Sequence, residues 1–256
     1  MKPLQHAQIT AKTYGGCWQD YIEVHSFLDS SKATCAHFKH RFLLHHAEGV
    51  ELGVRIFGEA IRNNEGREVA TRKTLTEHLI EDVGRVVAVE DWARDLLPDT
   101  NDSFYKQLAE KQAQIEAGAT SGESELLSEA FGLSDEDAGA VREFLAFPLR
   151  ASTHPGALLV SHNSFAVFLA EKIFGFAFAK KDNGDRNSKK QLIAVREVFE
   201  RVIFRRMKTV FSPAEIIART ASAEWMRGTD AMRAARKEKE RLADEAANKE
   251  ERCLGN

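Results

Sequence analysis

The chain has 256 residues, of which 43% are hydrophobic and 29% are charged, and its formal net charge is -3. This composition is ordinary for a globular protein, and the small net charge excludes a global electrostatic attraction to nucleic acid or anionic lipid. The 3 cysteines fit no disulfide framework and no zinc knuckle, and no stretch reaches the ~18 uninterrupted apolar residues of a membrane span. We therefore expect a soluble, cytoplasmic protein without a membrane partner.

Hydrophobic periodicity predicts a long helix in the first part of the chain. From Ala36 to Ile61, apolar residues recur at spacings of four and three, with His40 as the polar exception in the seam. This period is that of one helical face. We therefore expect a single helix that ends near Phe57 and Gly58.

Turn and stop signals define the elements that follow this helix. The polar stretch Asn63–Gly66 has apolar residues on both sides, which predicts a short β-hairpin. A helix is expected from about Thr74 to Val83, because Gly84 is a typical residue for ending a helix. Another helix should begin near Val89.

Much of this pattern occurs twice. Aligned without gaps from His45 and His162, the two segments share the pairs Val50/Val167, Leu52/Leu169, Ile56/Ile173, Phe57/Phe174, Gly58/Gly175 and Ala60/Ala177. The repeat predicts a tandem duplication and hence a mainly α protein of two related helical modules packed together, each with a long central helix and a small β-hairpin. The expected parts are a first module at 1–98, a linker and connecting helix at 99–140, a second, degenerate module at 141–222 and a charged helical tail at 223–256.

The histidines of the first module are the strongest functional signal. Residues 37–46 contain four of the 9 histidines. On the later helix, His78 and Asp82 lie four residues apart and share one face. Imidazole nitrogens and carboxylate oxygens on two packed helices are typical ligands of zinc, iron or manganese. We predict a divalent-metal site made by His40, His45, His78 and Asp82.

The predicted site allows two interpretations. If the protein supplied only three ligands, a bound water could become the nucleophile of a hydrolase, with Glu77 or Glu81 orienting a ligand or acting as general base. Because Ala157 replaces His40 in the second copy, this chemistry is expected in the first copy alone. The other interpretation is a group of core histidines bonded to carbonyl or carboxylate oxygens, since no HExxH or paired CxxC signature is present.

A basic helix face in the second module suggests a different function. Arg201, Arg205 and Lys208 fall on one face of the helix expected over 190–208, where they could meet phosphates or an acidic protein. A solvated helix face is the simpler interpretation of the same pattern. The alternative function is a non-catalytic interaction or inhibitor protein, phage-borne or regulatory, whose duplicated modules and charged tail bind a protein or a nucleic acid. A homo-oligomer is also compatible with this alternative.

The run from His25 to Trp92 carries a set of spaced motifs. They are His25, Phe27, Asp29, Ser31-Lys32-Ala33, His40-Arg41, the HHAEG from His45 to Gly49, Phe57-Gly58, Asn64, Gly66-Arg67, Val69, Arg72, Glu77-His78, Glu81-Asp82, Gly84-Arg85 and Asp91-Trp92. In these motifs the chain resembles an uncharacterised bacterial and bacteriophage family, a domain of unknown function. The resemblance implies that His40, His45, His78 and Asp82 belong to one pattern in a small helical domain, and it implies no activity.

Overall fold

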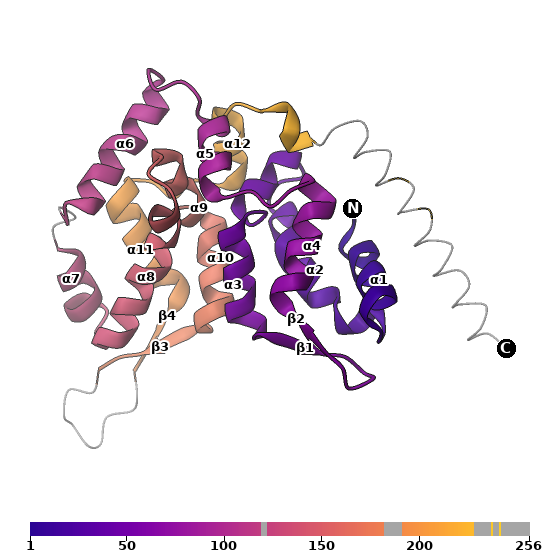
Figure 1. The fold of residues 1–256 in the computed structure, drawn as a ribbon. Coiled ribbons are helices and arrows are strands. Elements are labelled where there is room, and N and C mark those ends of the chain that lie inside the picture. Colours follow the sequence, from indigo (N-terminus) through magenta and orange to yellow (C-terminus); the bar gives the residue numbers. More distant parts are fainter. Residues whose placement is uncertain (119–121, 182–190, 228–236, 238–240, 242–256) are drawn as a thin grey trace. The chain divides into compact units, whose positions relative to one another are not determined.

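The structure is a computed structural model that describes residues 1–118, 122–181 and 191–227 together with Lys237 and Arg241. The chain divides into two compact units, whose helices and strands are labelled in Figure 1. Unit 1 comprises Met1–Ala88 and the described residues from Ser222 onward, and unit 2 comprises Val89–Ala221. Both are mainly helical with one small hairpin each, which confirms the predicted fold class. Within the described residues, no helix has the length and apolar character needed to cross a membrane.

Unit 1 is built around helix α2, which packs against α1, α3 and α4. Leu28 on α2 and Leu75 and Leu79 on α4 are fully buried, so an apolar layer fixes the distance between these helices. The elements are α1 (Pro3–Tyr14), the 3₁₀ helix η1 (Trp18–Asp20), α2 (Ile22–Asp29), the 3₁₀ helices η2 (Ser30–Ala33) and η3 (Phe38–Leu43), α3 (Ala47–Phe57), β1 (Ala60–Arg62), β2 (Glu68–Ala70), α4 (Thr71–Val83) and the 3₁₀ helix η6 (Glu224–Arg227).

The prediction of one continuous helix from Ala36 was wrong. The chain forms η3, breaks, and restarts as α3, because His46 is extended and its Nδ1 accepts the Gly49 backbone N–H at 3.0 Å as a helix cap. The corner is tight at Gly49, where a Cβ atom would lie 2.0 Å from the carbonyl oxygen of Leu44. This break directs residue 45 into the interior of unit 1, where it is fully buried.

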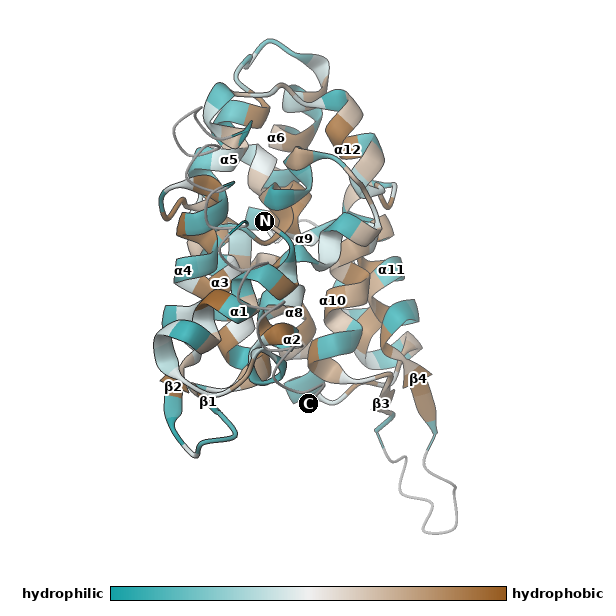
Figure 2. Ribbon diagram, turned by 90° about the vertical axis from the view of Figure 1, so that its right-hand side faces the viewer, coloured by the Kyte–Doolittle hydropathy of each residue, from teal (hydrophilic) through white to brown (hydrophobic). Residues whose placement is uncertain are grey.

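The hairpin and the following helix were predicted correctly. Strand β1 pairs antiparallel with β2, with Ile61 opposite Val69, and the exposed turn between them is hydrophilic (Figure 2). Helix α4 begins at Thr71 rather than Thr74 and ends at Val83, as expected. Gly84 closes it in the left-handed conformation, with φ of 89°.

Unit 2 begins with the helix that was expected near Val89. Trp92 on this helix is fully buried. In the segment 99–140, for which a linker and one connecting helix were expected, the described residues form two helices, a π turn and the start of a third helix. The elements are α5 (Val89–Leu96), α6 (Ser103–Glu116), α7 (Glu123–Glu125), the π turn η4 (Leu126–Ala130), α8 (Asp135–Ala151), the 3₁₀ helix η5 (Pro155–Ala157), α9 (Leu158–Ser161), α10 (Ser164–Phe174), β3 (Ala177–Ala179), β4 (Leu192–Ala194), α11 (Val195–Met207) and α12 (Pro213–Arg219).

The two units share one order of elements. Helix, hairpin and helix follow one another as α3, β1, β2 and α4 in unit 1 and as α10, β3, β4 and α11 in unit 2. The corresponding helices have equal lengths, 11 residues for α3 and α10 and 13 for α4 and α11. The turn of the hairpin predicted for the second module, and most of the predicted tail at 223–256, lie outside the described residues.

Candidate metal centre

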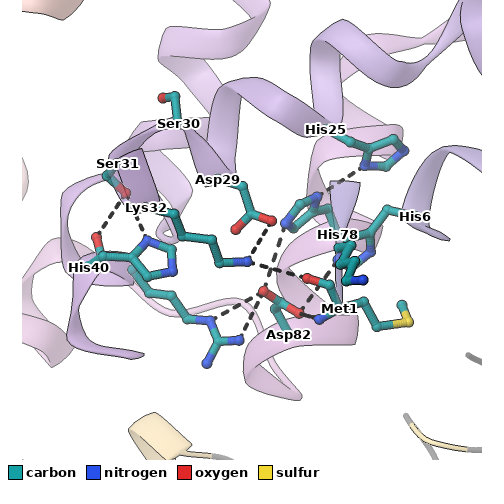
Figure 3. A network of polar contacts seen from close by, with 12 residues as sticks. Met1, His6, His25, Asp29, Ser30, Ser31, Lys32, His40, His78 and Asp82 are labelled. Atoms are coloured by element: carbon teal, nitrogen blue, oxygen red, sulfur yellow. Dashed lines mark hydrogen bonds and ion pairs between the residues drawn. The ribbon is translucent and has the colours of Figure 1, made fainter. Parts of the chain in front are cut away.

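Unit 1 buries an unusual group of imidazole and carboxylate side chains. The contributing elements are α1, α2, the corner between η3 and α3, and α4, as Figure 3 shows for the labelled residues. Each of these side chains belongs to a residue that is at most 5% exposed: His6, His25, Asp29, His45, His78 and Asp82. Buried ionisable groups are costly unless they are paired, hydrogen-bonded or bound to a metal. The group therefore needs a specific explanation.

Four of these residues converge on one point. Asp29, His45, His78 and Asp82 each offer one donor atom within 4.8 Å of the other three. His45 Nε2 lies 3.4 Å from Asp82 Oδ2 and 3.6 Å from Asp29 Oδ1, and His78 Nε2 lies 3.9 Å from Asp82 Oδ2. These separations are longer than ordinary hydrogen bonds. The two distances from His45 fall in the range of roughly 3.3–3.6 Å that separates ligands placed tetrahedrally at 2.0–2.2 Å from a zinc ion, and the distance from His78 is slightly longer.

Both carboxylates are held by cationic groups, each on the oxygen that faces away from the four-donor point and, in Asp82, also on the oxygen that faces it. Lys32 Nζ donates to Asp29 Oδ2 at 2.7 Å, and the Met1 ammonium donates to Asp82 Oδ1 at 2.7 Å (Figure 3). Arg41 donates from Nε and Nη2 to Asp82 Oδ2 at 3.2 and 3.1 Å. Such contacts orient carboxylates in the way that outer groups orient metal ligands.

The imidazole of His78 is held in the same manner. Its Nδ1 lies 3.0 Å from Nδ1 of His25, whose Nε2 lies 2.9 Å from Thr10 Oγ1. This chain of contacts fixes the ring and leaves its Nε2 directed at the four-donor point. Within the part of the chain that the structure describes, His78 Nε2 and Asp29 Oδ1 have no hydrogen-bond partner.

The electrostatics place these groups in the protonation states that metal binding requires. Burial lowers the pKa of His45 and lowers that of His78 well below its usual value. Burial opposes ionisation of Asp82, but contacts with His45 and His6 and the charge of Arg41 hold the pKa of this carboxyl well below its usual range. Neutral imidazoles and an ionised carboxylate are the metal-binding forms of these side chains.

A second group of three imidazoles shares His78 but is less suited to a cation. It consists of His6, His25 and His78, whose rings stack with centroids 3.8 to 5.5 Å apart. Burial lowers the pKa of His6, but Asp82 and Glu81 outweigh it and raise this pKa overall. A protonated imidazole is not a ligand.

Three of the four ligands predicted from sequence belong to the four-donor set, and His40 lies outside it. The Nδ1 of His40 lies 2.8 Å from Ser31 Oγ, and its ring is edge-on to that of His45 at 5.5 Å. The fourth donor is Asp29, which the ligand prediction did not include. A signal was present, because His25 and Asp29 have the same spacing of four on one helix as His78 and Asp82.

The two predicted acid–base residues also lie outside the set. Glu77 accepts a hydrogen bond from the Tyr14 hydroxyl. Glu81 Oε2 lies 2.6 Å from His6 Nδ1, and its side chain is 12% exposed. Glu81 therefore reaches the centre through His6, whose Nε2 lies 3.5 Å from Asp82 Oδ1.

The three predicted partner-binding residues lie together in unit 2. Arg201, Arg205 and Lys208 line one open cavity of about 1000 Å³, which Phe204 also lines. Arg201 is ion-paired with Glu197 at 3.0 Å on the same helix.

The position in unit 2 that corresponds to the four-donor point holds a different arrangement. His162 corresponds to His45, and alignment of α11 with α4 from their first residues places Arg206 at the position of Asp82. Arg206 Nη1 lies 3.2 Å from His162 Nε2, and its Nε and Nη2 donate to the two oxygens of Glu123 at 2.8 Å. A guanidinium group is thus the buried cation of unit 2.

Comparison with known proteins finds a family model that matches the first part of the chain, and this model carries no activity. Residues 1–101 match a family model described as a domain of unknown function (DUF6915), which confirms the resemblance to an uncharacterised domain family. The whole four-donor set lies within the matched stretch. No curated protein and no solved structure matches the chain.

Proposed function

We propose that unit 1 binds one divalent transition-metal ion through Asp29 Oδ1, His45 Nε2, His78 Nε2 and Asp82 Oδ2. The observation that carries the proposal is the spacing of these donors, which is too long for hydrogen bonds and suits a tetrahedral shell. Two imidazole and two carboxylate donors suit zinc, iron or manganese. Zinc fits the tetrahedral spacing best.

A network of ion pairs alone explains the cluster less completely. The ammonium of Met1 and the side chain of Lys32 contact the far oxygens of the two carboxylates. They therefore leave Asp29 Oδ1 and His78 Nε2 without hydrogen bonds in the described residues, at a cost of about 1–3 kcal/mol for each buried atom. A bound cation would satisfy both atoms at once.

The donor set favours a structural ion over a catalytic one. Catalytic zinc typically keeps three protein ligands and an exchangeable water, whereas structural zinc has four protein ligands. Asp29 supplies a fourth protein donor, and all four residues are at most 5% exposed. The ion would join α2, the corner before α3, and α4. Hydrolysis, which would need an open position for water, is therefore not part of the proposal.

The corresponding position in unit 2 supports this interpretation. We infer that the two units arose by tandem duplication and that unit 2 replaced a bound ion with its own cation, the guanidinium of Arg206. Glu123 neutralises this charge, and His162 accepts from it. Unit 2 thus has a positively charged group at the position where the proposal places a metal ion in unit 1. Both units would then have a cation at this point of the fold.

The test compares Asp29→Asn with His40→Asn in tag-free protein. Both residues are buried, at 5% and 2% exposure, so both variants perturb the same interior. Elemental analysis should find close to one ion per chain in the wild type and in His40→Asn, and a loss of that ion in Asp29→Asn. Chelator should lower the unfolding temperature of the wild type and of His40→Asn, but not that of Asp29→Asn. With free ion at a thousand times its Kd, the bound ion would stabilise the fold by about 4 kcal/mol.

Two results would contradict the proposal. If the wild-type protein stays metal-free after incubation with zinc, iron(II) and manganese(II), unit 1 does not bind these ions and the proposal is wrong. Loss of the ion in His40→Asn with retention in Asp29→Asn would mean that the ligands are those predicted from sequence and that the geometry was misinterpreted.

A further inference from the structure

We propose that the open cavity of unit 2 binds a free nucleotide, with its phosphates on Arg201, Arg205 and Lys208 and its base against Phe204. The proposal concerns a separate site and does not depend on the metal centre. It rests on the composition of the cavity, on an exposed aromatic ring, and on one strained residue.

The cavity combines size with a cluster of cationic side chains. Its volume of about 1000 Å³ is at the upper end of the range for small-molecule sites. Arg201 and Arg205 are four residues apart on α11, so they share one face. The lining contains four cationic side chains and one acidic side chain, Glu200. Two of the cations are paired with acids outside the lining, Arg206 with Glu123 and Arg201 with Glu197. The lining therefore carries more positive than negative charge, and guanidinium groups bind phosphate oxygens in pairs.

Phe204 supplies the second half of the recognition chemistry. It lines the cavity and is 56% exposed, although an aromatic ring of this size is normally largely buried. A flat nucleobase can stack on such a ring, and stacking tolerates all four bases. A nucleotide is a ligand that presents both a flat ring and phosphate groups, so it matches this lining better than an inorganic anion.

Lys208 is held in a conformation that its residue type disfavours. Its φ is 62°, and it is the sole non-glycine residue with positive φ among the described residues. The corresponding position after α4 is Gly84, for which this conformation costs little. Strained residues persist where the side chain has a use. The position of Lys208 on the cavity wall gives its ammonium that use.

The test measures binding of ADP, adenosine and inorganic phosphate to the full chain by isothermal titration calorimetry. ADP should bind at least ten times more tightly than either adenosine or phosphate, and added salt should weaken it. Phe204→Ala should weaken ADP about tenfold and leave phosphate unchanged. Lys208→Gly should also weaken ADP about tenfold while raising the unfolding temperature by about 2–4 °C, because the backbone strain is relieved.

Arg150→Ala is the matched control for Arg201→Ala. The two arginines are 57% and 60% exposed in their side chains, and each is paired with a glutamate on its own helix. Only Arg201→Ala should weaken ADP. The proposal is overturned if ADP does not bind, if phosphate binds as tightly as ADP, or if Lys208→Gly gains stability without losing affinity. Binding of a single-stranded oligonucleotide without binding of ADP would also overturn it, in favour of a nucleic-acid partner.

Discussion

His162 should make unit 2 sensitive to acid. The residue is fully buried, and burial together with the charge of Arg206 holds its pKa well below the usual value of 6.5. The unfolded chain binds a proton at this imidazole near pH 6.5, and the folded chain does not. Since stability rises with pH wherever the unfolded state binds more protons, the stabilisation is fully present above pH 6.5 and is lost as pH falls below it. For one such histidine the loss is about 1.4 kcal/mol at pH 5.5 and about 2 kcal/mol at pH 5.

The assay compares the wild type with His162→Gln, which keeps an acceptor for Arg206 but cannot titrate. Urea unfolding would be followed by the fluorescence of Trp92, the buried indole of unit 2, in a background that carries Trp18→Phe and Trp225→Phe. Between pH 7.5 and 5, the wild type should lose about 2 kcal/mol more stability than the variant. The other buried histidines titrate equally in both proteins and cancel in the difference. Parallel losses would refute the reasoning, because they would show that His162 takes up a proton in the folded state.

Two further predictions concern packing and the buried ion pair. Gly49→Ala should destabilise unit 1 by about 3 kcal/mol or more in urea unfolding followed by circular dichroism, because the new methyl group would meet the backbone oxygen of Leu44. Gly139→Ala, on α8 with open space around it, should instead stabilise unit 2 by about 1 kcal/mol in the Trp92 assay. Arg206→Met should cost about 3–5 kcal/mol by leaving the buried Glu123 carboxylate without its partner. The double variant Arg206→Met/Glu123→Leu should recover most of that stability, because it no longer buries an unpaired carboxylate. A double variant as unstable as Arg206→Met would show that the unpaired carboxylate is not the cause of the loss.

Local signals were enough to predict the hairpin and the helix after it. The turn at Asn63–Gly66 and the left-handed cap at Gly84 act over a few residues, so the sequence alone carries them. The prediction of one long helix was wrong because hydrophobic periodicity does not reveal where a helix is interrupted. Periodicity extends across the corner before α3, whereas the break depends on a histidine cap at His46, which is not a usual capping residue. Asn163, its counterpart in unit 2, is a usual capping residue and was the available sign of the break.

The candidate site was predicted in part because half of it is local. His78 and Asp82 share a helix face, so their spacing predicts their proximity. Asp29 and His45 join them only through the packing of α2 and of the corner against α4, which no sequence spacing encodes. The assumed continuous helix also made His40 seem equivalent to His45. In the structure His40 lies in a 3₁₀ helix and His45 lies in the break after it, so the two side chains point in different directions. The imidazole of His40 is hydrogen-bonded to Ser31.

X-ray absorption spectroscopy at the metal edge of the zinc-loaded protein tests the central claim most directly. The account predicts four nitrogen or oxygen neighbours at about 2.0–2.2 Å, with the outer-shell scattering of two imidazole rings and no sulfur. In Asp29→Asn the zinc should be lost, so its absorption signal should disappear. A six-coordinate shell of water oxygens, a sulfur ligand or the scattering of a third imidazole would contradict the proposed centre.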